Sequence, residues 1–363
     1  MIAQQLAARN FRTYEQLDIE LADRVTVVTG DNGAGKTNLL EALYFGCVGR
    51  SCRTKIDTQA IRFGESVARV EVEGDDSGEH HELAVAVDRS EGKTYFADGA
   101  KVESLEDFDW RPRTAVFMPD RLELVKGAPG VRRGHLDQFV AALWPARRAD
   151  RRAYSQALAQ RNAFVAAGRS GAELDAWDHE LATHGVALIA NRAAAIEQIE
   201  TRFAEIGEQL GLVDGGPTLR YRTIEEAGDI GAFRAALTER RDADRQRGFT
   251  TYGPHRDELV IKHQGREVRT YGSQGQQRLA LLSLLLAECE AIAELTSRNP
   301  LILLDDVMSE LDSTRRLLLV ERVQAIGQVM ITATEREHVP EHAAVESVIA
   351  VEAGRAEVVF SQT

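Results

Sequence analysis

Residues 30–37, GDNGAGKT, combine the residue types that proteins use to hold a chain of phosphates. Glycine lets a turn tighten and brings backbone N–H groups close to a ligand, while Lys36 can reach the outer phosphates and the Thr37 hydroxyl can hold Mg²⁺. The pattern G-x-x-x-x-G-K-[ST] is complete and predicts a nucleotide site, with a structural glycine turn as the alternative. The predicted nucleotide-binding residues are Gly30, Asp31, Asn32, Gly33, Ala34, Gly35, Lys36, Thr37 and Asn38.

Two neighbouring carboxylates, Asp305 and Asp306, follow the apolar run LILL at 301–304. A buried strand that ends in acids suits a parallel sheet, where ligands bind beyond the carboxyl ends of the strands. We expect Asp305 to support Mg²⁺, directly or through water, and Asp306 to orient or activate an attacking water. The alternative is an ordinary strand followed by an acidic turn.

A second glycine-bearing helix start, SQGQQR at 273–278, lies more than two hundred residues after the first. The Ser273 hydroxyl and the exposed N–H of Gly275 could bind an anion there. Two phosphate-binding helix starts in one pocket would be redundant, whereas on different faces they would let a γ-phosphate bridge two protomers. The stretch resembles the LSGGQ signature of ABC-type ATPases, and a simple helix cap is the alternative.

The residues around the first loop predict the elements that position it. Val25, Val27 and Val28 indicate a buried strand before the loop. A helix is predicted after the loop from the helical spacing of Leu39, Leu40, Ala42, Leu43 and Tyr44. Residues 1 to about 118 contain further strand-like stretches, and residues from about 120 to 245 are typical of helices. The mixed pattern returns from about 250 and ends in a predicted hairpin formed by VESVIAV and AEVVF.

Composition restricts the function less than the motifs do. The net charge of the 363 residues is −13, which argues against nucleic acid, yet arginine is concentrated at 111–113, 131–135 and 146–161. A solvated helix face is the alternative explanation of these runs. No apolar run reaches membrane-spanning length and no secretion signal is evident, so we expect a cytoplasmic protein. The three cysteines have no metal-ligand spacing.

The motifs together resemble one family. In order, NFRTYEQLDIEL, GDNGAGKTNLLEALYFGCVGRSCRT, FMPDRLELVKGAPGVRRGHLD, YGPHRDEL, SQGQQRLALLSLLLAE and LILLDDVMSELDSTRR are similar to the RecF family of bacterial recombination mediators, which are SMC-like ABC ATPases. The resemblance spans residues 10–316. It implies an α/β ABC-type P-loop ATPase head in two halves, 1–118 and 249–363, with a compact, mostly helical arm at 119–248 inserted between them.

The resemblance also implies an activity and partners. The family dimerises on ATP with Mg²⁺, binds duplex and gapped or single-stranded DNA without sequence preference, and hydrolyses ATP slowly with stimulation by DNA. It acts with RecR and RecO to direct RecA onto single-strand gaps, in the cytoplasm and associated with the nucleoid.

Carried over residue by residue, the resemblance assigns the phosphate loop to 30–37 and Mg²⁺ binding to Thr37 and Asp305. It assigns catalysis to Asp306, as the carboxylate, and to Lys36. The residues that would reach across the dimer are Ser273, Gly275 and Gln276, and those of the dimer loop are Ser309, Glu310 and Asp312. The expected DNA contacts at the entry to the arm are Arg132, Arg133, Arg147, Arg148, Arg151 and Arg152. Competing candidates near the loop are Arg12, Arg50 and Arg53, and Arg53 could equally hold the nucleotide. His255 and Arg256 are expected to have a nucleotide or interface role.

The sequence departs from related ATPases at three positions. Asp306 is one methylene shorter than the usual Glu, so we expect slow turnover. The switch histidine is missing, and Thr332 and Thr334 occupy its segment, which leaves γ-phosphate sensing to a hydroxyl or another group. The glutamine loop is not identifiable in VFMPDR at 116–121. Two other functions compete. One is a P-loop kinase or small-molecule ATPase, which needs no Ser273 motif and would work as a monomer. The other is a scaffold that uses ATP only to lock its shape, which the short Asp306 side chain suggests.

Overall fold

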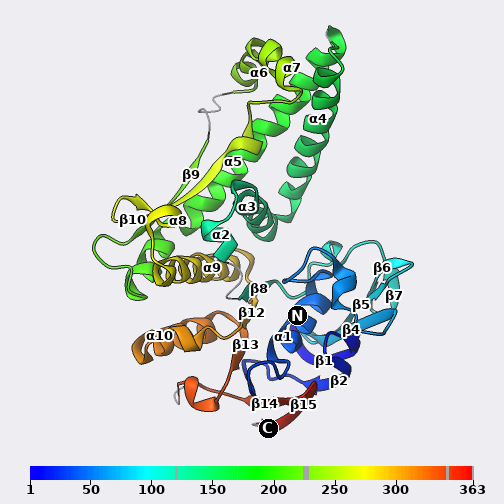
Figure 1. Ribbon diagram of the computed structural model, residues 1–363, viewed down its shortest axis with the longest axis vertical. Helices are drawn as coiled ribbons and strands as arrows, with labels where there is room; N and C mark the ends of the chain where they lie inside the picture. Colours follow the sequence, from blue (N-terminus) through cyan, green and yellow to red (C-terminus); the bar gives the residue numbers. More distant parts are fainter. Residues whose placement is uncertain (119–121, 170, 224–228, 341–342, 362–363) are drawn as a thin grey trace. The chain divides into compact units, whose positions relative to one another are not determined.

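The computed structural model describes residues 1–118, 122–169, 171–223, 229–340 and 343–361, with the side chain of Glu310 also outside the description. The chain forms two compact units, Met1–Arg121 with Ile292–Thr363, and Leu122–Ala291 (Figure 1). The second half of the segment VFMPDR, residues 119–121, lies outside the described residues. No helix in the described part of the chain is long and apolar enough to cross a membrane.

An antiparallel sheet forms one layer of the first unit, with the strand order β2-β1-β4-β5-β6-β7. Its strands are β1 (Ile2–Phe11), β2 (Tyr14–Glu20), β4 (Val67–Asp76), β5 (Glu79–Asp88), β6 (Gly92–Ala97) and β7 (Ala100–Val102). Side chains alternate between buried and exposed along β1, β2 and β4, which confirms the period of two expected for a sheet with one face on the core.

A second sheet in the same unit is mostly parallel and has the order β15-β14-β3-β13-β12-β8. Its strands are β3 (Val25–Thr29), β8 (Thr114–Phe117), β12 (Leu301–Leu304), β13 (Gln328–Ala333), β14 (Ser347–Glu352) and β15 (Arg355–Ser361). The predicted closing hairpin is confirmed, because β15 pairs antiparallel with β14. Since β3, β13 and β12 are parallel neighbours, their carboxyl ends meet at one edge of the sheet.

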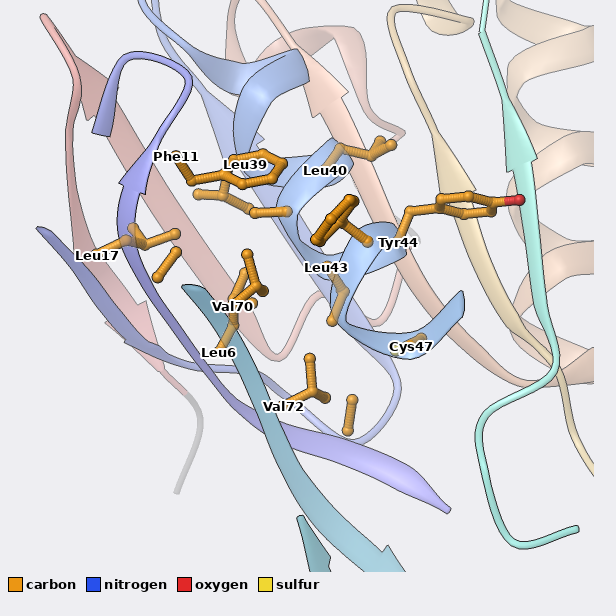
Figure 2. Packing of buried hydrophobic residues seen from close by; sticks show 14 of the residues in the cluster. Leu6, Phe11, Leu17, Leu39, Leu40, Leu43, Tyr44, Cys47, Val70 and Val72 are labelled. Carbon is orange, nitrogen blue, oxygen red and sulfur yellow. The ribbon is translucent and has the colours of Figure 1, made fainter. Parts of the chain in front are cut away.

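Helix α1 (Lys36–Val48) packs against strands of both sheets. Figure 2 shows Leu39, Leu40 and Leu43 of this helix among apolar side chains of the neighbouring strands. The helix is apolar on nearly every side, as expected of a fully enclosed helix. A Cβ added at Gly46 would lie 2.5 Å from Cγ2 of Val72, so a glycine is needed where the helix crosses the sheet. Among the described residues, the other α-helix that lies wholly within this unit is α10 (Ser313–Ile326).

The second unit is mainly helical, as predicted, and its long helices α4 (Arg148–Ala166) and α5 (Ala172–Gln209) lie side by side (Figure 1). A small sheet with the order β11-β10-β9 was not expected. Its strands are β9 (Pro217–Arg222), β10 (Glu258–His263) and β11 (Arg266–Glu267). The other helices are α2 (Glu123–Lys126), α3 (Pro129–Leu143), α6 (Ile230–Glu239), α7 (Arg241–Arg247), α8 (Val268–Tyr271) and α9 (Gln274–Thr296), the last of which continues into the first unit.

The bounds of the compact units differ from the expected segments at the second boundary. The expected arm ends at 248, whereas the second unit extends to Ala291. The reason is strand pairing, because β10 forms its hydrogen bonds with β9 in register, as at Leu259 opposite Tyr221. The stretch 249–291, which includes Ser273, therefore packs with the helical unit.

Candidate nucleotide site

The loop between β3 and α1 has the backbone geometry of a phosphate-binding turn. Gly30, Gly33 and Gly35 have φ values of 146°, 85° and 123°, a region that L side chains rarely adopt. A Cβ at Gly30 would also lie 2.2 Å from the carbonyl oxygen of Val351. No side chain caps the start of α1, so the N–H groups of its first turn are oriented for an anion.

Lys36 lies across this loop. Its Nζ donates hydrogen bonds to the carbonyl oxygens of Gly30 at 2.6 Å and of Asp31 at 2.9 Å. These two carbonyls use two of the three N–H groups of the ammonium. The lysine is only 8% exposed. The positive charge is therefore fixed above the glycines, where phosphates would lie.

Thr37 and Asp305 bring hard oxygen donors together at the sheet edge. The Thr37 hydroxyl lies 3.0 Å from both carboxylate oxygens of Asp305. Burial raises the pKa of Asp305 above its ordinary value, although hydrogen bonds from Thr332 and Thr37 act against this rise. A buried carboxylate beside a hydroxyl fits Mg²⁺, which takes oxygen ligands and keeps several waters. The described residues contain no cluster of three or more His, Cys, Asp or Glu side chains that could hold a metal ion. A Mg²⁺ site at Thr37 and Asp305 would therefore need water and phosphate oxygens as its other ligands.

Asp306 follows at the turn after β12. Its φ of 51° lies in the left-handed region, which Asp adopts more readily than most residues. Its backbone N–H donates to Oγ1 of Thr332 at 2.9 Å, and its carbonyl accepts a hydrogen bond from Oγ of Ser309. The two acids therefore lie at the same sheet edge as the glycine loop, as the sequence predicts.

A buried carboxylate under the loop was missed by sequence reasoning. Glu41, on α1, is fully buried and pairs with Arg12, while Ser51 donates a hydrogen bond to it. Arg53 lies 3.4 Å from the same carboxylate and 2.9 Å from Oδ1 of Asn38. A charged residue inside the apolar run LLEALYF was the signal that could have revealed this network.

The helix start at 273 has the geometry of a reciprocal cap. Oγ of Ser273 accepts a hydrogen bond from the N–H of Gln276, and Oε1 of Gln276 accepts one from the N–H of Ser273. This is the capping-box arrangement, in which each residue satisfies a backbone donor of the other. Ser273 and Gly275 are exposed. The cap considered as an alternative is thus present, and it leaves the motif accessible on the surface.

The expected dimer loop follows Asp306 closely. Besides the hydrogen bond from Ser309 to Asp306, the Asp312 carboxylate accepts one from the N–H of Arg315 and caps helix α10. The side chain of Glu310 lies outside the described residues.

The arginines expected to contact DNA are not equally exposed. Arg132 is 3% exposed and is paired with Glu258 at 2.7 Å, so its assignment as a DNA contact is wrong. Arg133 is half-buried and donates to the carbonyl of Asp257. The Arg147 guanidinium lies 3.9 Å from the Trp144 ring centroid.

The remaining candidates lie on helix α4. Arg151 and Arg152 are exposed, and Arg148 is half-buried. Arg161, from the same arginine-rich stretch, is fully buried between Asp178 and Asp244. Arginine density along the sequence therefore does not separate buried ion pairs from a basic surface.

His255 and Thr332 both have hydrogen-bonding partners within the chain. His255 accepts a hydrogen bond from the Tyr154 hydroxyl and donates from Nε2 to the carbonyl of Thr250, and burial lowers its pKa to about 4. Both of these partners lie in the helical unit, and the nucleotide or interface role of His255 stays a prediction. Thr332 is fully buried with its hydroxyl bonded to Asp305, and the Thr334 hydroxyl lies 2.9 Å from Nδ1 of His338. The γ-phosphate sensor, a hydroxyl or another group, stays open.

A glycine loop between a buried parallel strand and a helix, with an acidic pair at the end of a second parallel strand that one strand separates from the first, defines an ABC-type ATPase head. Residues 2–357 match the RecF/RecN/SMC N terminal domain model. The chain belongs to the RecF family of DNA replication and repair proteins.

Relatives and a solved structure support this membership. The RecF proteins of Myxococcus xanthus (strain DK1622) and Lactococcus lactis subsp. cremoris (strain MG1363) are 35% and 36% identical to this chain, each over 342 residues. The matches cover 91% and 93% of this chain and 90% and 94% of those relatives. A structure described as the recombination mediator protein RecF-ATP in the RecFOR pathway superposes with a TM-score of 0.86 at 25% identity, covering 99% of this chain and 97% of that one.

Proposed function

We propose that this chain is an ATP-dependent, DNA-binding recombination mediator that uses slow ATP hydrolysis as a switch. The observation that carries the proposal is the convergence of Lys36, Thr37 and Asp305 around a glycine loop that suits phosphates. The likeness to an ATP complex of a recombination mediator in the RecFOR pathway supports RecO and RecR as partners. Through them the chain would help to load RecA at single-strand gaps, in the cytoplasm and at the nucleoid.

The residues of the loop would bind and orient ATP. Backbone N–H groups of the loop and the first turn of α1 hold the phosphates, and Lys36 offsets their charge. Thr37 and Asp305 would hold Mg²⁺, which supplies charge neutralisation at the β- and γ-phosphate oxygens. Asp306 orients the attacking water and accepts its proton. Its short side chain supports a slow turnover.

Two protomers complete each site in this proposal. Ser273, Gly275 and Gln276 of one protomer contact the γ-phosphate held by the other, and Ser309, Glu310 and Asp312 line the interface between them. The exposure of Ser273 and Gly275 supports this role, because their atoms are accessible to a partner. The unit that contains both six-stranded sheets is the head, and the helical unit is the arm.

A mixing experiment tests the shared site. Lys36→Ala disables the loop, and Ser273→Arg blocks the surface motif, so each variant alone should be inactive. Mixed at equal concentration, they should recover part of the wild-type hydrolysis, since one site per mixed dimer combines an intact Lys36 with an intact Ser273. A monomeric ATPase would retain activity in Ser273→Arg alone. That result, or no recovery on mixing two folded variants, would overturn the shared site.

DNA provides the second part of the test. The specific hydrolysis rate should rise with protein concentration and with gapped duplex DNA at fixed low salt. A rate indifferent to both would contradict the switch and favour a monomeric enzyme. Nucleotide-dependent DNA binding without any measurable turnover would instead identify a scaffold.

A further inference from the structure

Thr332, in β13, has a buried hydroxyl that takes part in two hydrogen bonds. It donates a hydrogen bond to Oδ1 of Asp305 at 2.8 Å and accepts one from the backbone N–H of Asp306 at 2.9 Å. The side chain is 0% exposed. One hydroxyl on a neighbouring strand thus contacts both consecutive acids.

Thr332 is a polar residue in an otherwise apolar, buried stretch of β13. The residues around it in β13, from Val329 to Ala333, are buried and otherwise apolar. Valine has nearly the same shape as threonine, so packing alone would be satisfied by an apolar residue. A buried hydroxyl costs free energy unless it is hydrogen-bonded. Here the hydroxyl donates to the Asp305 carboxylate and accepts from the Asp306 backbone.

The backbone at Asp306 provides an independent observation. Its φ of 51° costs free energy for a residue with a Cβ and persists only where the surroundings hold it. The hydrogen bond from the Asp306 N–H to Thr332 is such a restraint. It fixes the peptide between the two acids, and therefore the direction in which each side chain leaves the strand end.

The same strand end also reaches the glycine loop. Ala333 is the register partner of Thr29, the last residue of β3, and the carbonyl of Thr334 accepts a hydrogen bond from the N–H of Gly30. The acid pair and the loop are thus joined through residues 332–334. A change at Thr332 would alter the position of Asp305 relative to Thr37.

We propose that Thr332 is a positioning residue that orients Asp305 toward Thr37 and holds the turn at Asp306. It acts through these residues on Mg²⁺-dependent nucleotide binding and does not itself contact the nucleotide. The inference rests on the proposed ATP-binding function, and it assigns to one buried hydroxyl the alignment of both acids.

Titration of a fluorescent ATP analogue at a series of Mg²⁺ concentrations tests the inference. Thr332→Val should raise the Mg²⁺ concentration needed for half-maximal binding by about 10- to 100-fold, the effect typical of losing an outer-shell partner of a metal ligand. Thr332→Ser keeps the hydroxyl and should restore the wild-type dependence. Affinity for the analogue in EDTA should not change. Thr26→Val is the matched control, since it removes a buried hydroxyl of the same sheet that accepts a hydrogen bond from the backbone N–H of Ala22, away from the acid pair.

An unchanged Mg²⁺ dependence in Thr332→Val would overturn the inference, as would an equal shift in Thr26→Val. Failure of the ATP-binding function itself would appear differently, as no binding of the analogue by the wild-type protein at any Mg²⁺ concentration. If Thr332→Val does not fold, Thr332→Ala replaces it in the comparison with Thr332→Ser. The expected result is then a shift for alanine alone, and equal behaviour of the two variants would contradict the role of the hydroxyl.

Discussion

Arg12 and Glu41 form a two-pronged ion pair beneath the phosphate loop, with Nε 2.9 Å from Oε2 and Nη2 2.7 Å from Oε1. Glu41 has no exposed surface, and the Arg12 side chain is 20% exposed. The pair joins the turn between β1 and β2 to helix α1. The helix that begins the nucleotide site is therefore anchored by charge as well as by apolar packing.

Arg12→Ala should destabilise the protein strongly. The variant would leave the Glu41 carboxylate buried with only Ser51 and the more distant Arg53, and breaking a buried pair in this way costs about 3–5 kcal/mol. The free energy of unfolding in urea measures the loss. Arg62→Ala is the control, because Arg62 pairs with a Glu15 side chain that is 76% exposed, and it should cost less than about 1 kcal/mol. Equal losses in the two variants would contradict this account of the buried pair.

The sequence predicts the strand, glycine loop and helix of the candidate nucleotide site well, because the signals for these elements are local. The glycines, Lys36 and Thr37 are adjacent in the chain, and the strand before them and the helix after them follow from hydrophobic spacing. The sequence also predicts that the acid pair lies at the ligand-binding edge of the sheet, because the carboxyl ends of parallel strands meet at one edge.

The arginines and the small sheet could not be predicted in the same way. Arg132 and Arg152 have similar sequence surroundings, yet the first is buried against Glu258, 126 positions away, and the second is exposed. Strand β9 pairs with a partner about forty residues further on. Pairings at such distances depend on the packed tertiary structure, which spacing along the chain does not encode.

Asp306→Asn should abolish hydrolysis while nucleotide binding is retained. Asparagine tolerates the left-handed backbone at this position as aspartate does, so the turn is preserved, but an amide cannot accept the proton of the attacking water. Single-turnover hydrolysis and binding of a fluorescent ATP analogue measure the two effects separately. Asp306→Ala would add backbone strain and is the less informative variant. Hydrolysis at the wild-type rate in Asp306→Asn would exclude Asp306 as the base.

His255 should make stability depend on pH below neutrality. Burial lowers its pKa to about 4, against an ordinary value near 6.5, so the unfolded chain binds the proton more tightly between these values. Stability is therefore fully present above about pH 6.5 and falls as the pH decreases toward about 4, by a total on the order of 3 kcal/mol. Urea unfolding at a series of pH values measures the slope.

His255→Gln should flatten this part of the pH profile. Glutamine does not titrate and can still donate a hydrogen bond to the Thr250 carbonyl, which His255 contacts in the native protein. The matched control is His80→Gln, because the His80 side chain is 66% exposed. A profile of His255→Gln as steep as that of the wild-type protein would show that other groups cause the pH dependence.

Replacing both Arg151 and Arg152 with alanine should weaken DNA binding without unfolding the arm. The Arg151 side chain is 58% exposed beside Asp137, and Arg152 is exposed, so both changes should cost little stability. If each arginine neutralises one phosphate, the slope of log affinity against log salt should become shallower by about 2. Arg220→Ala in the same unit is the control, since that side chain is 65% exposed and lies on β9. An unchanged slope in the double variant, or an equal change in Arg220→Ala, would remove this part of α4 from the DNA-binding surface.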